Sequence, residues 1–128
     1  MAVDTFIKKW NNKPLADDGC YVSKEFNAFQ NAFKREMDKI AQNIGGTLVR
    51  FSKGHYDVCG FIERNGKYVY FDYCSSLCGS RSTPMLTDRR AMYCRTAESA
   101  KDYRGGINNF TSFEECESVI NRLLDETD

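Results

Sequence analysis

Hydrophobic side chains recur at helical spacing along the first third of the chain. The pattern follows Ser23, a residue type favoured at helix N-caps, and it stops at Gly45-Gly46, which favours a helix end. Its apolar positions are Phe26, Phe29, Phe33, Met37, Ile40, Ala41 and Ile44. This spacing predicts one long amphipathic helix whose apolar side lies in the core.

Two shorter helices are predicted near the ends of the chain. Phe6, Ile7 and Trp10 lie on one side of a short opening helix. Thr111 and Glu114 have the spacing of a capping box, which predicts the start of a closing helix. The apolar stripe of that helix consists of Phe113, Cys116, Val119, Ile120, Leu123 and Leu124.

The central part of the chain has the pattern of β-strands. Residues 47–51 are apolar and β-branched, 56–64 and 67–74 flank Asn65-Gly66, and 91–96 form a last short strand. Asn-Gly between two such runs is the strongest short signal for a hairpin. The hairpin register predicts a core face of Val58, Gly60, Ile62, Val69, Phe71 and Tyr73. The opposite face then has Asp57, Cys59, Phe61, Tyr70, Asp72 and Cys74.

This order of elements predicts an α+β fold. We expect an antiparallel sheet of three to four strands, flanked by an N-terminal and a C-terminal helix that cover one face. A chain of 128 residues fits a single domain, residues 1–128, with one hydrophobic core. Residues 75–90 are polar and rich in Ser, Gly and Arg, so this long loop needs another source of order.

Four of the six cysteines gather around the predicted hairpin, which indicates a metal site. The chain opens without an apolar leader, so reduced thiols and zinc are expected before disulfides. Cys74 and Cys78 form a close pair, and Cys59 and Cys94 complete a tetrahedral structural zinc site that would order the loop. His55 is the alternative to Cys59 as the fourth ligand. The other interpretation is that these cysteines are small buried hydrophobes or free thiols.

Cys20 is a candidate for a different role, that of a catalytic nucleophile. This residue precedes the longest predicted helix and His55 follows later on a strand, which is the chain order of nucleophile and base in papain-like cysteine hydrolases. Because Ser23 is the expected cap, Cys20 would lie outside the first helical turn that lowers a thiol pKa. The alternative for both residues is a loop cysteine and a histidine at a strand end.

Charge is balanced, with eighteen basic and eighteen acidic residues. The chain therefore lacks the net positive charge expected of a nonspecific nucleic-acid binder and the net negative charge expected of an acidic DNA mimic. Basic residues still concentrate before the closing helix, at Arg81, Arg89, Arg90, Arg95, Lys101 and Arg104. Such a patch suits docking to a charged partner, with Tyr68 and Tyr70 as exposed anchors, and it leaves open a zinc-stabilised nucleic-acid-binding module. The apolar runs are too short to cross a bilayer, so we expect a soluble intracellular protein without membrane contact.

Two stretches of the chain resemble a known group of proteins. They are Phe51-Ser-Lys-Gly-His-Tyr-Asp-Val-Cys-Gly-Phe61 leading into Asn65-Gly-Lys-Tyr-Val-Tyr-Phe71, and Arg95-Thr-Ala with Lys101-Asp-Tyr-Arg-Gly-Gly-Ile-Asn-Asn109. In these stretches the chain resembles small zinc-containing anti-CRISPR proteins of streptococcal phages, within a broader group of small phage and conjugative-element proteins.

The resemblance implies a binding protein and not an enzyme. Its expected partner is the type II CRISPR nuclease in the cytoplasm of a bacterial host, which a monomer would bind so that target DNA is not loaded or cleaved. Because a mimic of duplex phosphates needs a large acidic excess, the balanced charge favours occupation of a protein surface.

Overall fold

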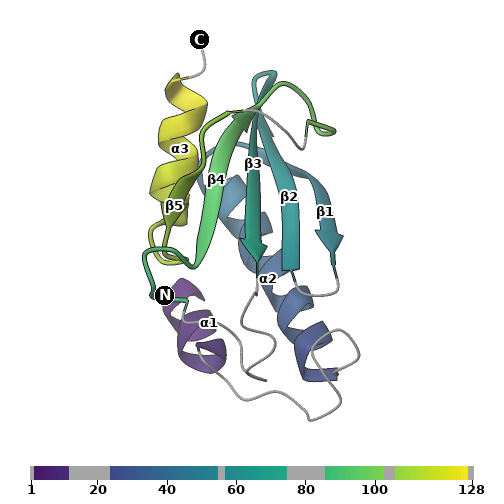
Figure 1. The fold of residues 1–128 in the computed structure, drawn as a ribbon, viewed down its shortest axis with the longest axis vertical. Helices are drawn as coiled ribbons and strands as arrows, with labels where there is room; N and C mark the ends of the chain where they lie inside the picture. Colours follow the sequence, from purple (N-terminus) through teal and green to yellow (C-terminus); the bar gives the residue numbers. More distant parts are fainter. Residues whose placement is uncertain (1, 12–23, 55–56, 75–85, 103–105, 127–128) are drawn as a thin grey trace.

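The computed structural model describes residues 2–11, 24–54, 57–74, 86–102 and 106–126 (Figure 1). Within these ranges the helices are α1 (Ala2–Trp10), α2 (Lys24–Asn43) and α3 (Cys116–Glu126). The strands are β1 (Thr47–Lys53), β2 (Asp57–Arg64), β3 (Lys67–Cys74), β4 (Met92–Ala97) and β5 (Asn109–Thr111).

All five strands form one antiparallel sheet in the order β1-β2-β3-β4-β5. α2 packs over β1 and β2, and α3 packs over β3, β4 and β5, so both helices cover the same face, while α1 lies beside α2 (Figure 1). The expected α+β class is confirmed. The sheet has one strand more than the sequence predicted, because β5 is only three residues long and has no apolar alternation. Residues 75–85 of the loop expected to be ordered by zinc lie outside the described residues.

The β2–β3 hairpin has the register that Asn65-Gly66 predicted. Arg64 pairs with Lys67, and the pairing continues without a shift to Asp57 and Cys74. Asn65 and Gly66 have φ angles of 54° and 82°, the two positive values that a type I′ turn requires. The alternation of side chains therefore places Val58, Ile62, Val69, Phe71 and Tyr73 on the face covered by the helices, where all of them are buried.

The core is built around aromatic rings, with Phe33 of α2 at its centre. Its ring lies 5.1 Å from that of Phe113, 5.3 Å from Tyr73 and 5.8 Å from Phe29, measured between centroids. Phe6 of α1 joins the same cluster, 4.7 Å from Phe113. Helix α1, helix α2, strand β3 and the turn before α3 thus meet in one cluster of rings.

The start of the closing helix differs from the prediction. Thr111 belongs to β5 and its hydroxyl donates to the Ser112 carbonyl, so it does not cap the helix. The regular helix begins at Cys116, and the Ser112 hydroxyl donates to the Glu115 carboxylate at 3.4 Å. The capping-box assignment to Thr111 and Glu114 was therefore wrong, because the short strand before the helix uses the residue expected to be the cap.

We expect Phe33→Ala to lower the free energy of unfolding by about 3–5 kcal/mol, because it leaves a cavity among rings that cannot collapse fully. The matched control is Phe110→Ala, which truncates a half-exposed ring and should cost less than about 1 kcal/mol. Denaturant unfolding of both variants measures the difference. Equal losses in the two variants would contradict the central position of Phe33.

Candidate functional site

Of the four predicted zinc ligands, the structure describes the side chains of Cys59 and Cys94. Cys59 pairs with Asp72 and lies half-buried on the face of the sheet opposite α2 and α3. Cys94 pairs with Phe71 and is buried in the core on the opposite face. Two thiols on opposite faces of one sheet cannot bind the same ion. The structure therefore does not bring Cys59 and Cys94 together in one site.

The remaining candidates for the metal site are less fully described. Cys74 pairs with Asp57 at the end of β3, but its side chain, Cys78 and the alternative ligand His55 lie outside the described residues. Among the side chains that are described, no group of three His, Cys, Asp or Glu residues could hold a metal ion. Burial raises the pKa of the Cys94 thiol to about 12, so this residue stays protonated and behaves as a small hydrophobe.

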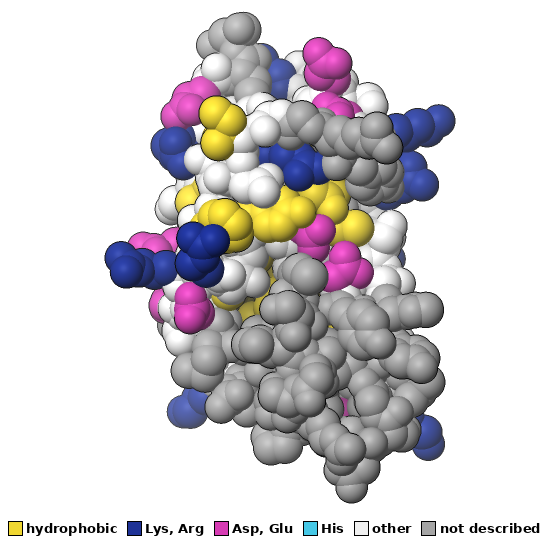
Figure 2. Space-filling view, viewed as in Figure 1, with side chains coloured by type: hydrophobic (Ala, Val, Ile, Leu, Met, Phe, Trp, Pro, Cys, Tyr) yellow, Lys and Arg dark blue, Asp and Glu magenta, His cyan; other side chains and the backbone are white. Residues whose placement is uncertain are grey.

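The face of the sheet away from α2 and α3, called the outer face below, has a row of aromatic side chains. Phe61, Tyr70, Tyr93 and Phe110 come from four successive strands, and neighbouring ring centroids are 5.1, 6.3 and 5.7 Å apart. Figure 2 shows hydrophobic side chains in a band across the middle of this face. The expectation that Tyr70 is an exposed anchor was wrong, since it is only 5% exposed.

Asp72 joins the tyrosines of this row. Its Oδ2 accepts hydrogen bonds from the Tyr70 hydroxyl at 2.9 Å and from the Tyr93 hydroxyl at 3.1 Å. The Arg95 guanidinium lies 4.4 Å from the Tyr70 ring centroid and 5.8 Å from that of Tyr93, and it donates to Asn108. These contacts fix the tyrosines and the arginine in one network below the surface.

Burial controls protonation in this network. Desolvation raises the pKa of the Asp72 carboxyl, although the two tyrosine hydroxyls that donate to it act in the opposite direction. Desolvation and the charge of Asp72 raise the pKa of both Tyr70 and Tyr93. The tyrosines therefore remain hydrogen-bond donors at neutral pH, and the network acts as a fixed support.

The row reaches the surface at β5. Phe110 is 44% exposed and Ile107, just before the strand, is 82% exposed. Arg90 stacks on the Phe110 ring with 4.0 Å between the guanidinium carbon and the ring centroid. We call Arg90, Tyr93, Ile107 and Phe110 the β5 patch. It combines exposed apolar area, an aromatic ring and an arginine, the residue types that dominate binding energy at protein interfaces.

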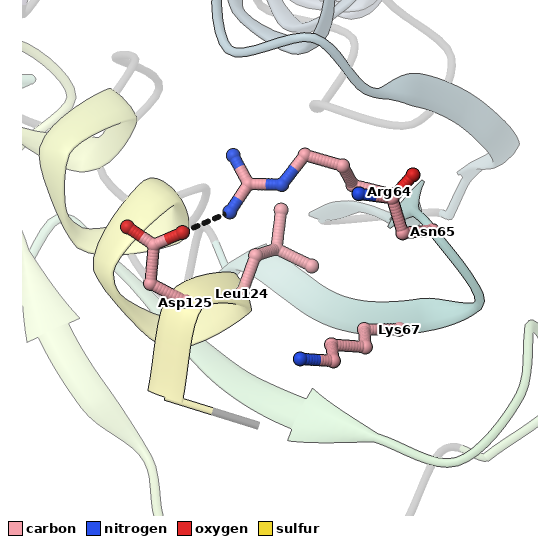
Figure 3. A pocket seen from close by; sticks show the side chains of 5 residues that line it. All are labelled: Arg64, Asn65, Lys67, Leu124 and Asp125. Atoms are coloured by element: carbon pink, nitrogen blue, oxygen red, sulfur yellow. Dashed lines mark hydrogen bonds and ion pairs between the residues drawn. The ribbon is translucent and has the colours of Figure 1, made fainter. Parts of the chain in front are cut away.

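A hollow of about 250 Å³ lies between the hairpin turn and the end of α3, lined by Arg64, Asn65, Lys67, Leu124 and Asp125 (Figure 3). Arg64 forms an ion pair with Asp125 across it, and it also donates to the Ile44 carbonyl and to Asn121. The guanidinium thus connects the hairpin to the C-terminal end of α2 and to α3, so we assign Arg64 a structural role.

The other sequence candidates have different outcomes. Cys116 is buried on the apolar side of α3, as its place in the stripe predicted. Cys20 and His55 both lie outside the described residues, so the hydrolase interpretation remains a prediction. The sequence did not single out Phe110, Ile107 or Asp72. The sequence signal for Ile107 and Phe110 was two apolar residues within a polar segment. The signal for Asp72 was an acidic residue between two tyrosines of the same strand.

Comparisons with known proteins give no relative for this chain: no family model, no curated protein and no solved structure matches it. Within the described residues, no helix is long and apolar enough to cross a membrane.

We expect Cys94→Ala to leave the zinc content per chain unchanged, because the Cys94 thiol faces the core. Elemental analysis of the purified variant and of the wild-type protein measures this. Cys78→Ser is the comparison variant, since loss of zinc in that protein alone would place the metal in the loop after β3. Loss of zinc from Cys94→Ala would contradict the assignment of this side chain to the core.

We expect Asp72→Asn to gain stability relative to the wild type as the pH rises above 3.8, the pKa of an unperturbed aspartate. Because the folded state raises the Asp72 pKa, the folded protein binds more protons than the unfolded chain in this range, and its stability falls as the pH rises through it. Asparagine removes that dependence. Denaturant unfolding at acidic and neutral pH measures the difference, with Asp38→Asn on α2 as the control. Parallel pH profiles of wild type and Asp72→Asn would refute it.

Proposed function

We propose that this protein acts by binding another protein through the β5 patch, and that its partner is a type II CRISPR nuclease. The proposal rests on the exposure of Phe110, on whose ring Arg90 stacks, and on the exposure of Ile107 three residues before it. Exposed aromatic rings and arginines are frequent anchors of protein interfaces.

Preorganisation supports this choice of surface. Tyr93 contacts Phe110 on one side and donates its hydroxyl to the buried Asp72 on the other. The anchor residues therefore stand on a fixed network, so binding would order few side chains. Because little conformational entropy is lost on binding to such a surface, more of the favourable contact energy remains as binding free energy.

Arg90 and Arg95 are better placed for contact with a protein than with nucleic acid. Arg89 and Lys101 are exposed, and Arg81 and Arg104 lie outside the described residues. Arg95, counted as part of the basic patch from sequence, is only 8% exposed and lies over the tyrosine rings. Arg90 stacks on Phe110, and its backbone N–H donates to Asp88, which places an acid beside it. A surface that contacts a phosphate backbone needs several exposed cations without neighbouring acids.

The nature of the partner follows from the resemblance of residues 51–71 and 95–109 to anti-CRISPR proteins of streptococcal phages. A protein of this kind blocks the nuclease by occupying a site needed for DNA loading or for the conformational change before cleavage. Its bacterial location would be the cytoplasm of the host, where the nuclease acts. The proposal includes no catalytic step.

The test uses guide-loaded type II nuclease from a streptococcal host and measures DNA cleavage and binding of the full-length protein. We expect the wild type to bind and inhibit, and the double variant Ile107→Ser/Phe110→Ala to lose affinity by about tenfold or more. Arg90→Ala should weaken binding as well. Arg122→Ala is the matched control, because it removes an exposed arginine on α3.

The outcomes separate the candidate functions. Full inhibition by a correctly folded Ile107→Ser/Phe110→Ala variant would refute the β5 patch, and absence of binding by the wild type would refute the nuclease as partner. DNA binding by the isolated protein that falls steeply with salt would favour the nucleic-acid module. Hydrolase activity abolished by Cys20→Ala would favour the cysteine hydrolase.

A further inference from the structure

A second surface lies at the other edge of the sheet, along β1. The strand order starts at β1, and no described strand lies beyond it (Figure 1). β1 has seven residues, whereas the opposite edge strand, β5, has three. An edge strand of this length presents backbone N–H and C=O groups that an added strand could pair with.

A groove runs between this edge and α2. A cavity of about 320 Å³ is lined by Lys34, Asp38, Leu48, Val49, Arg50 and Phe51. Leu48 and Phe51 are half-buried and pack against the core, so they form an apolar floor, and Val49 is 42% exposed. An extended segment beside β1 would direct every second side chain onto this floor.

The rim of the groove is basic. Lys34 is exposed on the α2 side, and Asp38 is the one acid among the lining residues. Arg50 is also exposed, but it pairs with Phe61 and so lies on the outer side of the edge, where its guanidinium donates to the Ala100 carbonyl at 3.4 Å. Lys53 lies at the end of β1, where its Nζ donates to Asn27 at 3.1 Å and to Asn31 at 3.0 Å on α2. The surface charge therefore complements an acidic segment.

The same charges disfavour pairing of β1 with a second copy of the chain. Antiparallel pairing of two β1 edges centred on Arg50 would place the Arg50 side chains of the two copies opposite each other, and like charges in that position destabilise a strand pair. A bulge between Leu48 and Arg50 interrupts the regular register, so it divides the pairing of any added strand, whether a second copy or a peptide, into two shorter stretches.

We propose that the β1 edge binds an extended acidic segment of a partner protein by strand addition. Backbone hydrogen bonds to β1 would fix the segment, and alternate apolar side chains would lie on Leu48 and Phe51. The acids between them would project on the outer side beside Arg50, while Lys34 and Lys53 on the α2 side add to the positive potential of the edge. This site is separate from the β5 patch, so the two proposals stand or fall independently.

The probe is a fluorescein-labelled octapeptide of alternating Glu and Val, titrated into the full-length protein by fluorescence anisotropy. We expect saturable binding that weakens with salt. Hydrogen exchange should show added protection in the amides of residues 47–53. Two control peptides, one with Lys in place of Glu and one with Pro in place of two Val residues, should not bind, because they remove the charge complementarity and the strand pairing respectively.

Variants of the protein test the location. Lys34→Glu, which changes only the α2 side of the groove, and Lys34→Glu/Arg50→Glu should each weaken binding, the double variant by about tenfold or more. Phe110→Ala at the other edge should bind like the wild type. The proposal is overturned by absence of binding, by unchanged affinity in folded charge-reversal variants, by protection of amides outside β1, or by concentration-dependent dimerisation through β1 without peptide binding.

Discussion

The packing of Phe33 against the covered face of the sheet is the contact on which the rest of the fold depends. Its ring touches residues from α2, β3 and the segment before α3, and Phe6 closes the cluster from α1. Elements far apart in the sequence are thus held together by one set of rings. Because interiors are close-packed, the position of each helix over the sheet is set by this cluster and is not adjustable independently.

The helices cover one face of the sheet, and the side chains on the other face form contacts of a different kind. Side chains alternate along each strand, so every residue that packs on the helices has a neighbour that points outward. On the outer face, Tyr70, Asp72, Tyr93 and Arg95 form hydrogen bonds and ring contacts with one another. They support a surface whose exposed part is confined to the β5 end.

The two edges of the sheet differ in kind. At β5 the strand is short, and what it offers a partner is side chains, namely Phe110 with Arg90 stacked on it, and the exposed Ile107 before the strand. At β1 the strand is longer and borders a groove with a basic rim, so it offers backbone groups as well as charge. A small sheet with one covered face can therefore present two binding surfaces of distinct character, because neither edge is closed by a further described strand.

The sequence by itself determined the features that depend on local spacing: the long helix, the pairing across Asn65-Gly66 and the core face of the hairpin. A tight turn fixes register and a helical period fixes one face, so few residues suffice. Only the tertiary structure decided where Cys94 points and how deeply Tyr70 is buried. Both depend on the pairing of β4 with β3, which follows a long connection whose length sets no register. The short strand β5 likewise forms because β4 offers it an edge, and nothing in its own three residues predicts it.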